Sequence, residues 1–290
     1  MEKTFCFVVQ WRQVVNDTTL ASVVSPTMIH SRGLQNFGFC LLIWICLFIQ
    51  GTAASAPIDV PLITYYDYPP FTLQNASKSL TQELAEYLSQ ASNGRFHFSV
   101  KVIPKGRLDV MMEKPDWKGV IAWINPKFVH DEAKTRYLWT AAIMNEIDLV
   151  ASNKEAPHDY KGPESLRGLK LGAVLNQRYA DVEDMIAKGA LIRTNARSQE
   201  NVLNMLIHRR VDVAFVSKST LSWFRIHLKG FEQKVGFSPV PRNTFTRHVM
   251  LSRTLPPDVV DYVTKTTNGL GSQAQWQDIM NRFHIKDQIP

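Results

Sequence analysis

Along residues 57–150, the apolar positions change from the period of a strand to that of a helix and back again. An unbroken apolar run at residues 60–63 predicts a buried strand. Leucines recur at helical spacing over residues 80–91, behind the capping-box pair Ser79 and Gln82. Further apolar or alternating runs predict three more strands, at residues 96–102, 119–123 and 147–151. This order of elements is typical of a parallel-rich α/β fold.

The same pattern begins again after a polar linker at residues 152–164. Strands are predicted at residues 169–175 and 211–216, and helices at residues 180–188, 198–207 and 219–227. A last strand at residues 248–252 and two helices, the second capped by Ser272, then return to the first unit. The sequence therefore predicts two α/β lobes. Lobe 1 comprises residues 57–150 and 241–290, and lobe 2 comprises residues 151–240.

An aromatic and proline-rich segment, Tyr65–Phe71, separates the first predicted strand from the first helix. Prolines restrict φ and hold the preceding residues extended, so the rings are presented rigidly at the carboxyl end of a strand. Ligands bind at that edge in open α/β sheets. We therefore expect Tyr66, Tyr68 and Phe71 to contact a ligand. The alternative is a proline turn whose aromatic side chains cover a core.

The front of the chain has the pattern of a secretory signal. An apolar run of eleven residues, Phe39–Ile49, is too short to span a bilayer and is followed by small residues up to Ala56. We expect cleavage after Ala54 and export to the periplasm, with Met28 as the true start of translation. We take residues 1–56 as the leader together with its cleavage region, so that lobe 1 begins at residue 57. The alternative is an uncleaved anchor or a buried helix.

Cysteine usage and charge agree with an exported protein of modest basicity. The three cysteines, Cys6, Cys40 and Cys46, all precede the expected cleavage site, so no disulfide framework is predicted for the mature part. Residues 1–56 hold three basic and two acidic residues, which leaves 30 basic and 24 acidic side chains beyond them. These charges are dispersed, and we expect no nucleic-acid partner.

Several short motifs, taken in their order and spacing, resemble one protein family. They are Tyr68–Phe71 with its following helix, Arg136–Thr140, Ser165–Gly172, Arg209–Ala214 and the closing helix at Trp276–Phe283. Together they resemble bacterial periplasmic solute-binding proteins of the amino-acid type, known as solute-binding family 3. The resemblance covers nearly all of residues 58–285. It implies two lobes joined by two crossing strands, a monomer that holds a small solute between them, and an ABC-type permease as the membrane partner.

The chain departs from that family at both ends of the expected amino-acid clamp. Family members that bind α-amino acids carry an arginine for the carboxylate, and spacing from Trp139 puts its place at Ala133. Their amine-binding aspartate corresponds to Ser217. An ordinary α-amino acid is therefore a doubtful ligand.

Other side chains offer a different site. The turn at Gln177, Arg178 and Tyr179 precedes a predicted helix, whose amino terminus favours an anion. Trp123 ends the second buried strand and Asn125 follows it, and they offer a stacking surface and a polar group. We expect a small polar or anionic solute. The alternatives are a solvated Arg178 and a core position for Trp123.

No catalytic arrangement, metal-ligand spacing or cofactor-binding loop is found in the sequence, so we expect no catalytic residues, no metal and no cofactor. A few relatives of this fold are enzymes, notably cyclohexadienyl dehydratases. Glu200 or Asp212 would be candidate acids for such an activity. A third alternative is a sensor whose closed form binds a membrane receptor.

Overall fold

The computed structural model describes residues 56–73, 78–175 and 177–290. The predicted signal run, the expected start at Met28 and the cleavage site after Ala54 lie outside these residues. The strands are β1 (Ile58–Thr64), β2 (Phe96–Val102), β3 (Val120–Ile124), β4 (Leu138–Trp139), β5 (Met144–Asn153), β6 (Lys170–Val174), β7 (Ile192–Ala196), β8 (Val213–Ser217), β9 (Val235–Phe237) and β10 (Asn243–Leu251). The α-helices are α2 (Leu80–Ala91), α3 (Lys105–Met112), α4 (Glu183–Ala187), α5 (Gln199–Ile207), α6 (Leu221–His227), α7 (Phe231–Lys234), α8 (Pro257–Asn268) and α9 (Ala274–Arg282). Short 3-10 helices are η1 (Pro126–Val129), η2 (Pro163–Leu166), η3 (Lys218–Thr220), η4 (Leu270–Ser272) and η5 (Lys286–Gln288).

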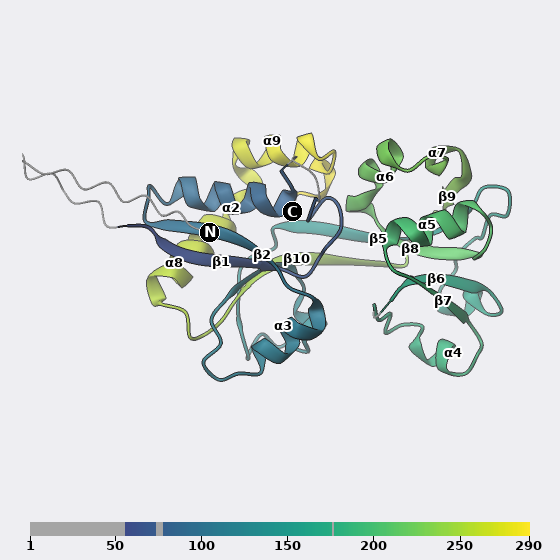
Figure 1. The fold of residues 1–290 in the computed structure, drawn as a ribbon, viewed down its shortest axis with the longest axis horizontal. Coiled ribbons are helices and arrows are strands. Elements are labelled where there is room, and N and C mark those ends of the chain that lie inside the picture. Colours follow the sequence, from purple (N-terminus) through teal and green to yellow (C-terminus); the bar gives the residue numbers. More distant parts are fainter. Residues whose placement is uncertain (1–55, 74–77, 176) are drawn as a thin grey trace, which may run out of the picture. The chain divides into compact units, whose positions relative to one another are not determined.

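All strands of the described residues form one continuous sheet with the order β2-β1-β3-β10-β5-β8-β6-β7, to which β4 and β9 add at the sides. Strands at the two ends pair in parallel, whereas β10 and β5 are antiparallel to each other and to their outer neighbours. The predicted two-lobe α/β fold is confirmed: lobe 1 is built around β1–β4, lobe 2 around β6–β9, and β5 and β10 run between them (Figure 1).

In lobe 1, the sheet is covered on both faces, which explains its continuous apolar strands. Successive residues of β3 alternate between two cores: Val120 packs with α2, α8 and α9, whereas Ile121 packs with α3 and the segment around Trp117. The predicted capping box is confirmed at the start of α2, where the Ser79 hydroxyl accepts from the Gln82 amide at 3.3 Å and the Gln82 side chain accepts from the Ser79 amide.

Lobe 2 repeats the two-sided arrangement. Along β8, Ala214 and Val216 pack against α5, α6 and α7, whereas Val213 and Phe215 face a second core that includes Met185 of α4. The predicted cap at Ser198 is confirmed, since its hydroxyl accepts from the Asn201 amide. The prediction for Ser272 is wrong, because this hydroxyl donates to the Gly269 carbonyl within a 3-10 turn and the following helix α9 has no side-chain cap.

Asp131 has a structural role that the sequence did not reveal, since its neighbourhood reads as a solvated turn. The side chain is only 3% exposed. Its carboxylate accepts from the backbone amides of Thr135, Arg136 and Tyr137 at 2.8–3.1 Å and from the indole of Trp139 at 2.8 Å. Burial alone raises the pKa of Asp131, but these hydrogen bonds outweigh it and hold the pKa below its usual value. The loop before β4 is therefore organised around one carboxylate.

Replacing Asp131 by asparagine is expected to lower the free energy of unfolding by about 2–3 kcal/mol, because an amide group then faces backbone donors that need an acceptor. The native pKa lies below the unfolded value of about 3.9, so the carboxylate stabilises the fold above that pH and loses its effect as the pH falls through the native pKa. Chemical denaturation across pH 2–7 should show the wild-type advantage shrinking on acidification. A constant difference would contradict this account.

No helix within the described residues is long and apolar enough to cross a membrane.

Candidate functional site

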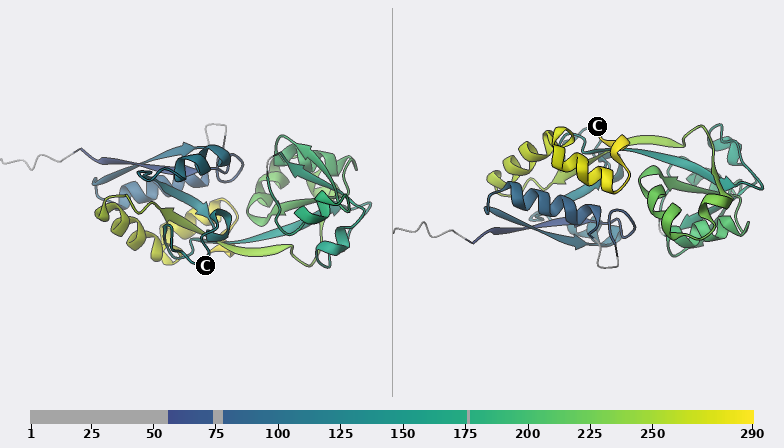
Figure 2. Two further views of the ribbon diagram at one scale, coloured as in Figure 1. Left: turned by 90° about the horizontal axis from the view of Figure 1, so that it is seen from below. Right: turned by 90° about the horizontal axis from the view of Figure 1, so that it is seen from above.

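Two long strands connect the lobes and carry polar residues at their centre. Residues 144–148 of β5 pair with residues 243–247 of β10, in antiparallel register. Each strand then leaves its partner: β10 continues beside β3 and β5 continues beside β8. Both views in Figure 2 show the two strands side by side between the lobes. Side chains at this crossing can therefore contact both lobes.

A buried ion pair lies at the crossing. Arg247 of β10 donates from Nε and Nη2 to Oε2 of Glu146 on β5, at 3.0 and 2.9 Å, and its side chain is only 1% exposed. Glu146 also accepts from the hydroxyl of Ser219 in η3 at 2.7 Å. Nη1 of Arg247 donates to the carbonyl of Trp123 in lobe 1 at 3.0 Å. One network thus joins both crossing strands to one element of each lobe.

Two of the aromatic residues predicted to bind ligand cover this arginine instead. The rings of Tyr66 and Phe71 lie 4.6 and 4.7 Å from the Arg247 guanidinium, a distance at which cation–π attraction contributes. Phe71 is fully buried and Tyr66 nearly so. In this structure neither ring is open to a solute, so their first role is to complete the packing around the ion pair.

Trp123 also lies in the core. Its side chain is 0% exposed, stacks on Trp276 of α9 at 6.3 Å and donates from Nε1 to the Thr81 hydroxyl at 2.9 Å. The φ of 67° puts its backbone in the left-handed region, which is uncommon for a bulky residue and persists where packing fixes it. The core alternative for Trp123 is the one that this structure shows.

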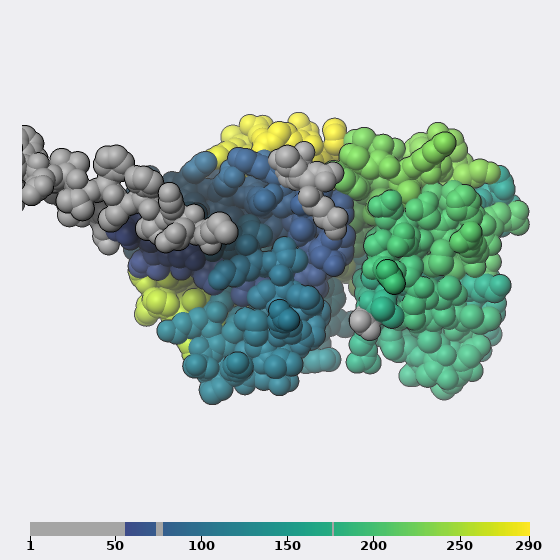
Figure 3. Space-filling model, in the orientation of Figure 1, coloured from purple at the N-terminus to yellow at the C-terminus, as the bar shows by residue number. Residues whose placement is uncertain are grey.

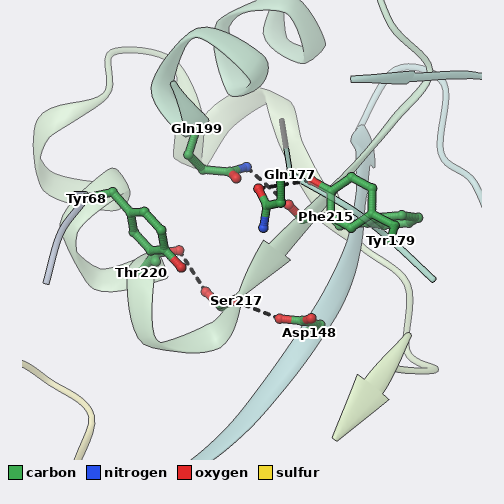
Figure 4. Close-up of a pocket in the computed structure, with 8 residues that line it drawn as sticks. All are labelled: Tyr68, Asp148, Gln177, Tyr179, Gln199, Phe215, Ser217 and Thr220. Atoms are coloured by element: carbon green, nitrogen blue, oxygen red, sulfur yellow. Dashed lines mark hydrogen bonds between the residues drawn. The ribbon is translucent and has the colours of Figure 1, made fainter. Parts of the chain in front are cut away.

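A polar pocket lies beside the crossing strands; its cavity volume is about 20 Å³, and it opens to solvent. Of the described residues, lobe 1 contributes Tyr68, while loops and strand ends of lobe 2 and the strand β5 supply the rest. A groove runs between the lobes on the face drawn in Figure 3. The lining residues are Tyr68, Asp148, Gln177, Tyr179, Gln199, Phe215, Ser217 and Thr220 (Figure 4).

Asp148 is the acidic residue of this lining. It stands opposite Ser217 in the pairing of β5 with β8, and its Oδ1 accepts from the Ser217 hydroxyl at 2.7 Å. Its Oδ2 lies 3.4 Å from Nη1 of Arg242, which is a long contact for an ion pair. The side chain of Asp148 is 18% exposed, so part of the carboxylate is open to the pocket.

Arg242 does not line the pocket, and one edge of its guanidinium is bound to Asp181. It forms a two-pronged ion pair with Asp181, with Nε donating to Oδ2 at 2.9 Å. Its flat face lies over the rings of Phe215 at 4.2 Å and Tyr179 at 5.0 Å. Two carboxylates therefore share one guanidinium, and the shorter contacts belong to Asp181 rather than Asp148.

The loop that carries Gln177 and Tyr179 is held by Arg193 of β7. This side chain donates to the carbonyls of Val174 and Gln177 at 2.9 and 2.7 Å. The Tyr179 hydroxyl in turn donates to Oε1 of Gln177 at 3.3 Å. Burial raises the pKa of Tyr179 to about 12, so the hydroxyl keeps its proton at neutral pH. The loop is thus fixed by contacts within lobe 2.

The other predicted contacts lie away from the pocket. Arg178 is exposed and is absent from the lining. Asn125 caps η1 and donates from Nδ2 to the Thr246 carbonyl at 2.8 Å. The helix expected from residue 180 begins only at Glu183, and its first turn holds two acidic residues, Glu183 and Asp184. Negative side chains at that helix end oppose an anion there. Four predicted residues do line the pocket: Tyr68, Gln177, Tyr179 and Ser217.

Sequence reasoning missed the other half of the lining. Asp148 had one visible signal, since it interrupts the apolar run at residues 147–151. Thr220 and Gln199 stand at the starts of predicted helices, next to Ser219 and Ser198, but polar residues are common at such positions. Phe215 lies within an apolar strand and carried no signal. Their meeting depends on strand pairing that the sequence does not specify.

Comparison with known proteins adds information on the fold. No protein-family model matches the sequence, and no curated protein is significantly similar to it. Among solved structures, an ancestral arginine-binding protein bound to arginine is similar with a TM-score of 0.61 and 12% identity, over 79% of this chain and 99% of that one. A protein described as an L-cystine ABC transporter from Listeria monocytogenes gives 0.62 and 11%, over 80% and 98%.

A third similar structure is an ancestral amino-acid-binding protein described as a precursor of cyclohexadienyl dehydratase. It gives a TM-score of 0.57 and 11% identity, over 78% of this chain and 94% of that one. At such low identity these likenesses show the fold alone. That fold, with two lobes and two connecting strands, is the one that the resemblance in the sequence implied.

Proposed function

We propose that this protein binds a small polar solute in the pocket beside β5 and delivers it to an ABC-type permease. The observation that carries the proposal is the lining itself. One aromatic side chain from lobe 1, Tyr68, meets polar groups of lobe 2 and Asp148 around one pocket. The similar solved structures are described as amino-acid-binding and ABC transporter proteins, which supports the same class of function.

The mechanism that we propose is hinge closure. Lobe 1 (residues 57–150 and 241–290) and lobe 2 (residues 151–240) would rotate about β5 and β10, bringing Tyr68 onto a bound solute. Closure would present a surface that the permease recognises. We further propose that the mature protein acts as a monomer in the periplasm, after removal of the leader.

A thermal-shift screen of amino acids, organic acids, amines and sugars tests the proposal. A ligand at about one hundred times its Kd adds roughly 2.7 kcal/mol of stability. For a domain of this size that corresponds to a rise in Tm of roughly 5–10 °C. Absence of any stabilising compound from a broad screen would count against solute binding.

Replacing Tyr68 by alanine is expected to weaken binding of the strongest hit by about tenfold or more, because the variant removes an aromatic wall of the pocket. Isothermal titration measures the change in Kd. Tyr68→Phe is the matched control: it keeps the ring and loses the hydroxyl, so a smaller effect is expected. Equal Kd values for wild type and Tyr68→Ala would place the solute elsewhere.

The enzyme alternative has less support in the pocket. The carboxylates considered from the sequence, Glu200 and Asp212, are both exposed, and Asp212 accepts from the Lys170 amide at 2.7 Å at the start of a strand. Neither lines the pocket. We therefore propose binding without turnover. Conversion of prephenate or arogenate by the purified protein would overturn this, and a neighbouring gene for a receptor kinase rather than a permease would favour the sensor alternative.

A further inference from the structure

We infer that the pocket selects a solute with a positively charged head group bearing several hydrogen-bond donors, such as a primary ammonium or a guanidinium, and that Asp148 is its charged contact. This rests on the proposed function and names the class of solute. It gives the solute a positive charge, whereas the turn at Gln177 and Arg178 predicted an anion. The direction of the hydrogen bonds around the pocket carries it.

The hydroxyl groups of Ser217 and Thr220, near Asp148, both donate their protons within the protein. Ser217 donates to Asp148 at 2.7 Å, and Thr220 donates to the Ser217 carbonyl at 2.7 Å (Figure 4). A hydroxyl has one proton and two lone pairs. Towards the pocket, both oxygens can therefore only accept.

Gln199 is oriented in a similar way. Its Nε2 donates to the Phe215 carbonyl at 3.1 Å, which fixes the amide and leaves its oxygen as an acceptor. The donors that remain in the lining are the Tyr68 hydroxyl and amide hydrogens of Gln177 and Gln199, and these groups are neutral. The lining therefore offers mostly acceptors and one negative charge.

Arg242 does not offer a positive charge to a solute in the pocket. Its side chain is only 8% exposed, its edge is bound to Asp181, and its face is covered by Phe215 and Tyr179. Its one contact with Asp148 is the long one, from Nη1 to Oδ2 at 3.4 Å. An anion would meet Asp148 without an available cation among the lining residues and would be repelled. A cation would gain charge-assisted hydrogen bonds to the carboxylate. The ring of Tyr68 adds a surface that favours cations.

The position of Asp148 explains why the sequence indicated the opposite charge. The aspartate expected for an amine is replaced by Ser217, but Asp148 stands opposite that serine on the neighbouring strand and is bonded to it. The carboxylate is thus supplied from β5 rather than from β8. Among the residues that the structure describes, no arginine lines the pocket, and Ala133 is exposed. A carboxylate on the solute is therefore not required.

Four probe compounds of similar length test the inference by isothermal titration at low salt. Agmatine carries a guanidinium and an ammonium, 1,4-diaminobutane carries two ammonium groups, 1,4-butanediol is neutral, and succinate is an anion. We expect the two cations to bind at least about tenfold more tightly than the diol or succinate. A charge-assisted hydrogen bond accounts for a difference of that size.

Asp148→Asn tests the contact itself, because it keeps the shape and removes the charge. We expect it to weaken binding of the cations by about tenfold or more, while Asp184→Asn, which removes the same charge from exposed α4, leaves the Kd unchanged. Ser217→Lys is a second variant, should the first fail to fold. Its ammonium group would compete for Asp148, and cation binding should be lost.

The outcomes separate this inference from the proposed function. Equal or tighter binding of succinate or the diol would overturn the cation class and leave solute binding intact. Equal losses in Asp148→Asn and Asp184→Asn, or cation binding by Ser217→Lys at the wild-type Kd, would overturn the contact. If the four probes do not bind but the wider screen yields a ligand, a cation supports the inference and an anion or neutral compound overturns it. If nothing binds, the proposed function itself fails.

Discussion

Replacing Arg247 by methionine is expected to lower the free energy of unfolding by about 3–5 kcal/mol. The guanidinium is buried with both nitrogens of one edge on Glu146 and its third nitrogen on the Trp123 carbonyl. Methionine fills a similar space but leaves the Glu146 carboxylate buried without a cation. Removing one partner of a buried pair is costly mainly for that reason. Urea denaturation of the wild type and the variant measures the difference.

Two control variants show whether the effect comes from the buried charge. Adding Glu146→Gln to Arg247→Met removes the unpaired carboxylate, while the amide oxygen can still accept from Ser219, so part of the lost stability should return. Arg282→Met breaks an exposed pair with Glu83 and should cost no more than about 1 kcal/mol. A loss of similar size in Arg247→Met and Arg282→Met would contradict the structural role of the network.

The same network bears on hinge closure. Glu146 is bonded to Arg247 on the other crossing strand and to Ser219 at the start of lobe 2. Since a buried ion pair has steep geometric requirements, motion of the lobes is expected to occur around this cluster rather than through it. The cluster and the pocket are close together on β5: Glu146 belongs to the cluster, and Asp148, two residues later, lines the pocket.

Much of the fold was predictable because two-sided burial leaves a strong signal. Residues 119–123 are a continuous apolar run and residues 211–216 are apolar except for Asp212; the structure places both segments in central strands with a core on each face. The helix of residues 80–91 had both an apolar stripe and a capping box. By contrast, β7 and β9 are short strands at the side of lobe 2 with few buried side chains, and the sequence did not indicate them.

The site was harder to predict, for a physical reason. Aromatic residues near a strand end are equally consistent with a ligand wall and with a core, and only Tyr68 of the segment Tyr65–Phe71 lines the pocket. Tyr66 and Phe71 are buried by Arg247, which lies more than 170 residues later in the sequence. The carboxylate of Asp148 reaches the pocket because β5 pairs with β8 in the register that puts Asp148 opposite Ser217. Such contacts depend on long-range strand register, which local patterns do not encode.

Trp123→Ala is expected to lower the free energy of unfolding by about 3–5 kcal/mol, the range observed when a large aromatic side chain is removed from a core. The variant loses the stacking on Trp276 and the hydrogen bond to Thr81, and it leaves a cavity between β3 and α9. Thermal or urea unfolding measures the change. Trp223→Ala on α6, where the ring is half-buried and stacks on His227, is the matched control and should cost less.

A second variant, Trp123→Phe, separates the two interpretations of Trp123. As a core residue, Trp123→Phe should reduce stability while the folded protein keeps its Kd for the solute, because the side chain is 0% exposed and lies outside the pocket lining. As a ligand contact, it would weaken binding with little change in stability. Isothermal titration below the Tm of the variant distinguishes these results. The combination of lost stability and retained affinity would fix Trp123 as part of the scaffold that supports Arg247 through its backbone carbonyl.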